Sequence, residues 1–210
     1  MVGGEYRRTE THQLISQTQK NINTMSCNLS AGRQEVCKES VGGLQGVYFM
    51  NYPSSSYNPT FSTDVLNGTI TAFPSGSTVY YYQLKGNSAY TETVNSSRDN
   101  GTTFFSQALT LNLKKLTNEM TTQLKLMAYG RPVAIVWTTN GEALVAGLTK
   151  GTDLTGGTIQ TGAGLGDMFG YSITMTGLEP LPALFITGST ATNPFAAVGN
   201  APTVVSGSAA

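Results

Sequence analysis

The chain has 210 residues, and its 12 lysines and arginines are balanced by 12 aspartates and glutamates. This neutrality argues against attraction to nucleic acid or to an anionic membrane, because both need a positive field. Charged residues make up only 11% of the chain, against about 25% in an average soluble domain. We therefore expect neighbouring subunits to cover part of the surface. No run of 18 apolar residues occurs, so the sequence predicts no membrane-spanning helix.

The two ends of the chain differ in composition from its middle. Residues 1–24 are rich in Thr, Gln and Asn and lack the apolar core of a signal peptide. They are either a flexible arm or an upstream extension, with Met25 as the natural start. Residues 188–210 are rich in Gly, Ser, Ala and Thr, which is typical of a linker or a loose tail. We therefore expect a β domain over residues 25–187, between an N-terminal arm and a low-complexity C-terminal tail.

The two cysteines, Cys27 and Cys37, lie ten positions apart. A disulfide is possible if they face each other on a hairpin. Without a signal peptide or further cysteines, two reduced thiols are the favoured interpretation. A Cys/His zinc site is not expected, because the only histidine, His12, lies in the N-terminal arm.

The stretch from residue 44 to residue 101 predicts short strands separated by turns. The expected strands are Leu44–Tyr52, Thr69–Phe73, Val79–Leu84 and Ala89–Asn95. The turns are marked by Asn67-Gly68, Pro74–Ser77 and Ser96–Gly101. We expect the turn-rich segment Gly86–Gly101 to project from the sheet and to contact a neighbouring subunit.

A longer strand and a hairpin are predicted on either side of residue 120. In the first, apolar residues alternate with polar ones, as in a half-buried strand; they are Phe105, Leu109, Leu111 and Leu113. Further on, Val133–Trp137 reads as a second strand, and Asn140-Gly141 is a strong hairpin signal.

Between these strands the sequence predicts the one helix of the fold. Thr117 is its expected N-cap, and the helix runs to Tyr129 with Met120, Leu124 and Met127 on one face. Gly130 is expected to end the helix in a left-handed conformation. The fold class that follows is mainly β: an antiparallel sandwich or barrel with one flanking helix at about residues 117–129.

A glycine-rich stretch, Gly162–Asp167, superficially resembles a phosphate-binding loop. The dinucleotide fingerprint requires its glycines between a strand and a helix, but Tyr171–Thr176 alternates as a strand does. We interpret Gly162–Asp167 as a bulged connection within a long hairpin.

No residue pattern indicates catalysis. With no histidine after Met25, serine–histidine and cysteine–histidine pairs are excluded from that part of the chain. A carboxylate pair can still assemble in three dimensions, although structural roles are favoured for these scattered residues. They are Glu35, Glu39, Asp64, Glu92, Asp99, Glu119, Glu142, Asp153, Asp167 and Glu179. We predict that the protein is not an enzyme and has no catalytic residue, cofactor or metal site.

Four stretches of the chain resemble virion structural proteins of tailed bacteriophages, and most closely subunits of the tail-tube type. They are Val41-Gly-Gly-Leu44 leading into Tyr48-Phe49, Ser97-Arg-Asp-Asn-Gly-Thr-Thr-Phe-Phe105, Leu126-Met-Ala-Tyr-Gly-Arg131, and Gly156–Gly162 running through Gly166-Asp167 to Gly170–Thr174. The resemblance covers roughly residues 25–187. It implies a β-sandwich or barrel that closes into a ring, of six subunits in such tubes, whose sheets line a channel for DNA.

The expected function is therefore that of a self-assembling tail-tube subunit located in the virion. Its partners would be further copies of itself and other tail or neck proteins, with DNA only as transient cargo and no membrane. One alternative is another virion ring: a neck, head-completion or tail-terminator protein. A second alternative is a carbohydrate-binding β-sandwich, with stacking groups at Tyr80, Tyr81, Tyr82, Tyr90 and Trp137.

Overall fold

The computed structural model describes residues 29, 31–34, 37–52, 61–64, 67–85 and 87–207. The chain from Glu39 onward forms one compact unit. The residues described in it form strands and one helix: β1 (Leu44–Met50), β2 (Ser62–Asp64), β3 (Thr69–Ala72), β4 (Thr78–Gln83), β5 (Ala89–Ser97), β6 (Thr102–Lys114), α1 (Asn118–Tyr129), β7 (Val133–Thr138), β8 (Ala143–Ala146), β9 (Asp153–Gln160), β10 (Gly170–Glu179), β11 (Leu184–Ile186) and β12 (Thr203–Ser206).

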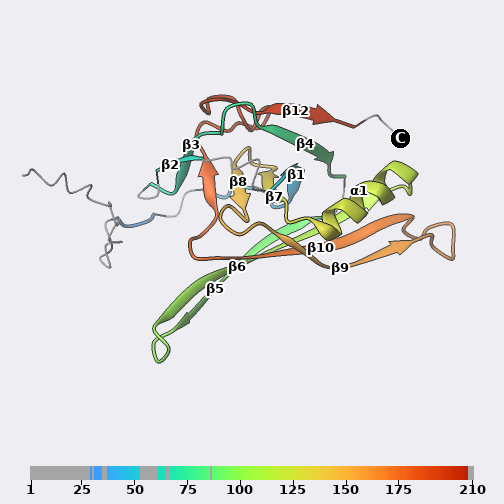
Figure 1. The fold of residues 1–210 in the computed structure, drawn as a ribbon, viewed down its shortest axis with the longest axis horizontal. Helices are drawn as coiled ribbons and strands as arrows, with labels where there is room; N and C mark the ends of the chain where they lie inside the picture. Colours follow the sequence, from blue (N-terminus) through green and yellow to red (C-terminus); the bar gives the residue numbers. More distant parts are fainter. Residues whose placement is uncertain are drawn as a thin grey trace, which may run out of the picture. The chain divides into compact units, whose positions relative to one another are not determined.

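The strands form two sheets (Figure 1). The larger sheet has the strand order β12-β4-β1-β7-β8-β11-β3-β2, and the smaller sheet has the order β5-β6-β10-β9. The pairings of β11 with β3 and of β12 with β4 are parallel, and the other pairings between the named strands are antiparallel. The predicted fold class, a mainly β, mostly antiparallel sandwich or barrel with one flanking helix, is confirmed, with β11–β3 and β12–β4 as parallel pairings.

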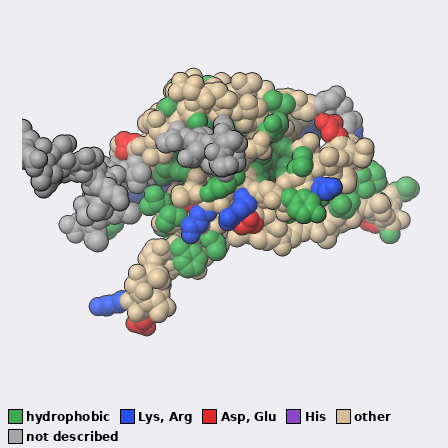
Figure 2. Space-filling model, in the orientation of Figure 1, with side chains coloured by type: hydrophobic (Ala, Val, Ile, Leu, Met, Phe, Trp, Pro, Cys, Tyr) green, Lys and Arg blue, Asp and Glu red, His purple; other side chains and the backbone are tan. Residues whose placement is uncertain are grey.

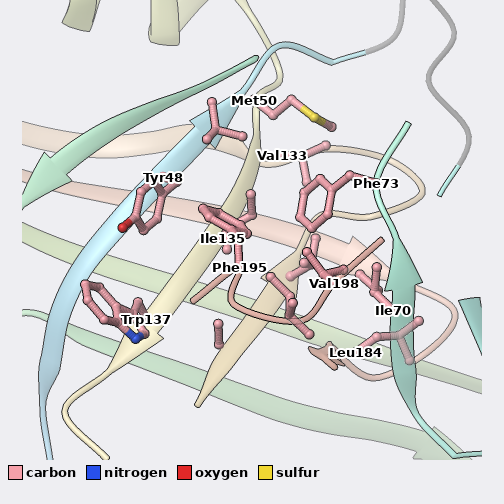
Figure 3. Close-up of a cluster of buried hydrophobic side chains, with 14 residues drawn as sticks. Tyr48, Met50, Ile70, Phe73, Val133, Ile135, Trp137, Leu184, Phe195 and Val198 are labelled. Carbon is pink, nitrogen blue, oxygen red and sulfur yellow. The ribbon is translucent and has the colours of Figure 1, made fainter. Parts of the chain in front are cut away.

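The larger sheet curls around a core of its own. A bridge between Ala72 and Gly199 connects the β3 side of the sheet to the segment that leads into β12. Apolar side chains from β1, β7 and β3 meet inside this curl together with Phe195 (Figure 3). The Trp137 ring is buried there, and its Nε1 donates a hydrogen bond to the carbonyl oxygen of Thr190 at 3.0 Å.

A second core fills the space between the two sheets. Leu109, Leu111 and Leu113 of β6 are buried in it, as the alternation in the sequence predicts. They pack with Tyr171, Ile173 and Met175 of β10 and with Val47, Phe49, Ala134 and Val136 of the larger sheet. The helix covers this core with Met127, which is buried, and with Leu124, which is only partly buried.

The helix begins where the sequence predicts. The Thr117 hydroxyl accepts a hydrogen bond from the Met120 backbone N–H at 3.1 Å, and the Tyr171 hydroxyl donates to the Thr117 carbonyl at 2.9 Å. The prediction of a left-handed Gly130 is wrong. Its φ is −95°, in the extended region, and its N–H donates to the carbonyl of Leu126, so the last turn closes without a left-handed residue.

The prediction of a loose C-terminal tail is wrong for residues 188–207. Phe195 and Val198 are buried in the first core, and β12 pairs in parallel with β4. Two buried apolar side chains and the pairing of β12 therefore anchor a segment whose average composition resembles a linker. The predicted arm at residues 1–24, together with Met25, Cys27 and Glu35, lies outside the described residues.

Candidate assembly surface

The smaller sheet has one covered face and one open face. Side chains alternate between the two faces along each strand. The inward-pointing ones on β6 and β10, Leu109 and Ile173 among them, form the core between the sheets. The outward-pointing ones are exposed or partly exposed, and none of them is buried.

The open face is rich in hydroxyl and amide groups. Its residues include Thr91, Thr93 and Asn95 on β5, Ser106, Ala108, Thr110 and Asn112 on β6, Ser172, Thr174 and Thr176 on β10, and Thr158 and Gln160 on β9. Two exposed apolar side chains, Phe104 and Leu178, lie on the same face toward the hairpin. The Thr155 and Thr176 hydroxyls lie 3.1 Å apart and form a hydrogen bond. Charged side chains occur only at the ends of this face, at Lys114 and Asp153. Its centre is a polar surface without charge.

Both outer strands of the smaller sheet have an unpaired edge. No strand of the described chain pairs with the outer side of β5 or of β9. The nine residues of β5 pair with β6 in one uninterrupted register, without a bulge. Natural proteins usually protect such an edge with lysines, prolines or bulges. The one charge on β5, Glu92, points inward and accepts hydrogen bonds from Gln107 Nε2 at 3.1 Å and Ala183 N–H at 3.0 Å.

The hairpin of β5 and β6 extends beyond the rest of the smaller sheet. The pairing of β10 with β6 stops at Phe105, so the hairpin continues as two strands only (Figure 1). Of the predicted projecting segment Gly86–Gly101, only the part from Asn95 onward lies beyond β10, as the end of a hairpin, whereas Ala89–Val94 lie within the sheet and Gly86 is outside the described residues. Most of the segment is the strand β5, and the turn is confined to Arg98–Gly101. Two large apolar side chains near this turn are exposed, Val94 at 61% and Phe104 at 41%.

A shallow hollow lies at the opposite end of the same sheet. Its lining comes from the segment just before β5, the end of β6 and the connection between β9 and β10: Asn87, Asn112, Lys114, Lys115, Gly166, Asp167, Met168 and Phe169. The Asp167 carboxylate accepts hydrogen bonds from Gly164 N–H at 2.7 Å and Ala163 N–H at 2.8 Å. These bonds lower the pKa of Asp167, so the carboxylate is anionic at neutral pH.

The glycine-rich segment Gly162–Asp167 connects β9 to β10, as predicted. The predicted bulge is displaced from it. The register between β9 and β10 shifts within β9, opposite Thr174 and Met175, while the glycines shape the loop held by Asp167. The φ of Gly162 is +71°, a conformation that favours glycine.

The structure does not gather the candidate carbohydrate-stacking residues into one platform. Trp137 and Tyr81 pack in or against the first core, and Tyr82 and Tyr90 pack against the second. Tyr80, on the same strand as Tyr81 and Tyr82, is 39% exposed. Burial is the main cause that raises the pKa of Tyr82 to about 12, with smaller contributions from Glu119 and Tyr80. These rings therefore serve mainly to pack the two cores.

Several of the candidate carboxylates make structural contacts. Glu179 is buried and accepts the backbone N–H groups of Thr149 and Lys150 at 3.1 and 2.7 Å. Asp153 pairs with Arg131 at 3.1 Å. Within the described ranges, no three His, Cys, Asp or Glu side chains are grouped so that they could hold a metal ion.

Sequence reasoning missed Gln107, a buried residue that links the two sheets. Its Oε1 accepts the Gly147 N–H at 2.8 Å, and its Nε2 donates to Glu92. The sequence does contain a signal for this residue: Gln107 is polar, although it lies at an inward position of the alternating pattern, between Phe105 and Leu109. Cys37 is an exposed free thiol.

In the part of the chain that the structure describes, no helix is both long and apolar enough to cross a bilayer. Comparison with protein-family models, with curated proteins and with solved structures finds no match to this chain.

Proposed function

We propose that this protein is a structural subunit of a tailed-bacteriophage virion, a tail-tube subunit that assembles into rings around a channel for DNA. The resemblance of the sequence to such subunits suggests this function. The main supporting observation is the smaller sheet, whose two outer strands both have an unpaired edge, with β5 paired to β6 in an uninterrupted register.

The direction of the strands favours a repeating contact between copies. The four strands alternate in direction, so β5 and β9 run opposite ways. If β9 of one copy lies beside β5 of the next around a common axis, the new pair is antiparallel, like the pairs within the sheet. Such a contact joins two different surfaces, and it closes into a ring when the rotation between copies divides a full turn.

The open face suits the wall of a channel. A ring joined through β5 and β9 carries the sheet around its circumference, with the core of each subunit on one side and the hydroxyl-rich face on the other. Because the centre of that face has no Lys or Arg, it offers no strong binding site for phosphate groups, and DNA can pass without being held. The partners in this proposal are further copies of the chain and other tail or neck proteins of the virion.

A substitution at the free edge tests the proposal. Thr91→Lys combined with Thr93→Lys places two charges on β5, where lysines oppose edge pairing. Thr174→Lys is the matched control, because it adds a lysine to the same face on a central strand. We expect wild type and control to form rings or tubes in negative-stain micrographs, and the edge variant to remain monomeric with an unchanged β circular-dichroism spectrum.

Two results count against the proposal. Normal rings from the edge variant would show that β5 is not the contact. A wild-type protein that stays monomeric at high concentration and binds a glycan would favour the carbohydrate-binding alternative.

A further inference from the structure

We propose that the tip of the β5–β6 hairpin of one copy docks into the hollow at the opposite end of the smaller sheet of a second copy. The inference rests on the proposed function, because it supplies the contact by which one ring stacks on the next. It assigns a receptor surface to the hairpin tip.

The placement of the two surfaces favours a head-to-tail contact. The strand β6 begins at Thr102 beside the tip and ends at Lys114, which lines the hollow. In Figure 1 the hairpin tip and the β9–β10 connection lie at opposite ends of the sheet. A second copy displaced along the strands by about the length of β6, roughly 40 Å at about 3.3 Å per residue, brings its tip to this hollow.

The charges of the two surfaces are complementary. The tip carries Arg98 and Asp99, both exposed, and Figure 2 shows a basic and an acidic group at the end of the projecting hairpin. The hollow carries the exposed Lys114 and Lys115 and the Asp167 carboxylate, which the loop hydrogen bonds keep anionic. Each charge of the tip can therefore face an opposite charge in the hollow, and a pair of this kind sets the direction and register of docking.

Apolar surface accompanies the charges on both sides. Phe104 and Val94 are exposed on the hairpin, and Phe169 at the hollow is 49% exposed. Leu165, in the connection beside the hollow, is fully exposed. Burial of these side chains between two copies would add a hydrophobic contribution to a contact whose direction the charges determine.

Reversal of one charge on each surface tests the contact. Asp99→Lys places a lysine against Lys114 of the next copy, and Lys114→Asp places an aspartate against Asp99. We expect each variant to form rings but to stack at least about tenfold less well than wild type, because like charges then face each other at every junction. Lys125→Asp, on the exposed side of the helix, is the matched control and should stack normally.

A mixture of the two variants gives the sharper result. In alternating stacks, the lysine introduced at position 99 of one variant meets the aspartate introduced at position 114 of the other, and the next junction joins the native Asp99 and Lys114. The mixture should therefore form tubes under conditions in which neither variant does so alone, as judged by sedimentation and negative-stain microscopy. Normal stacking of both single variants, or no recovery in the mixture, would overturn the tip-to-hollow contact while rings still formed. Absence of rings in the wild-type protein would contradict the ring proposal as well.

Discussion

Replacement of Leu111 by alanine tests how the smaller sheet packs on the larger one. Leu111 is 0% exposed and lies opposite Ile173, which is 1% exposed, in the core between the sheets. A buried Leu→Ala substitution costs about 2–5 kcal/mol, and more where the surroundings cannot collapse into the cavity. Because Leu111 lies between Ile173 of the neighbouring strand β10 and the apolar side chains of the larger sheet, we expect about 3–5 kcal/mol. For a chain of this size that lowers Tm by roughly 6–20 °C.

The assay is urea unfolding followed by the fluorescence of Trp137, the only tryptophan, at a concentration where the protein is monomeric. Trp137 is buried in the other core, so a single shared transition would also show that the two cores unfold together. Thr110→Ala, on the open face beside Leu111, should cost less than about 0.5 kcal/mol. A near-neutral Leu111→Ala with a costly Thr110→Ala would show that the two faces have been assigned the wrong way round.

Three smaller effects follow from the same contacts. Thr117→Ala removes the hydroxyl that caps the helix and should destabilise the protein by about 1 kcal/mol in urea unfolding, whereas loss of less than about 0.3 kcal/mol would argue against the cap. Burial raises the pKa of Tyr82 above its unfolded value of about 10 to about 12, so its contribution to stability is complete below pH 10 and is lost as the pH rises through 12. Tyr82→Phe should flatten the fall in Tm between about pH 10 and about pH 12, and an unchanged profile would refute the assignment. Arg131→Ala should cost less than about 1 kcal/mol in urea unfolding, because the Arg131–Asp153 pair is exposed; a larger loss would show that Arg131 packs more tightly than the structure indicates.

Local signals in the sequence were sufficient to predict those elements whose defining contacts join residues close together in the chain. The capping hydroxyl of Thr117 and the Asn140-Gly141 turn form contacts within a few positions, so both can be predicted from the sequence alone. The inward leucines of β6 were predicted for a similar reason, since a period of two can be read without knowledge of the partner strand.

The features that depend on distant partners could not be predicted in this way. Phe195 is buried because the larger sheet curls back toward it, and nothing in its low-complexity neighbourhood signals that. In the sequence, Gln107 is only a polar residue among apolar ones. Its role depends on hydrogen bonds with Glu92 and Gly147, which are distant in the chain. The candidate assembly surface likewise depends on distant parts of the chain. The alternating pattern of β5 and β6 could be predicted from the sequence. The free edge of β5 could not, because it depends on the strand order of the sheet.

The most direct test of the account is electron cryo-microscopy of the full chain, purified and concentrated. We predict rings or stacked tubes in which the smaller sheet forms the inner wall. Adjacent subunits should be joined through β5 and β9, with strands about 4.8 Å apart across each junction, as they are within a sheet. A strictly monomeric protein, or rings in which the hydroxyl-rich face of the smaller sheet points outward, would contradict the account.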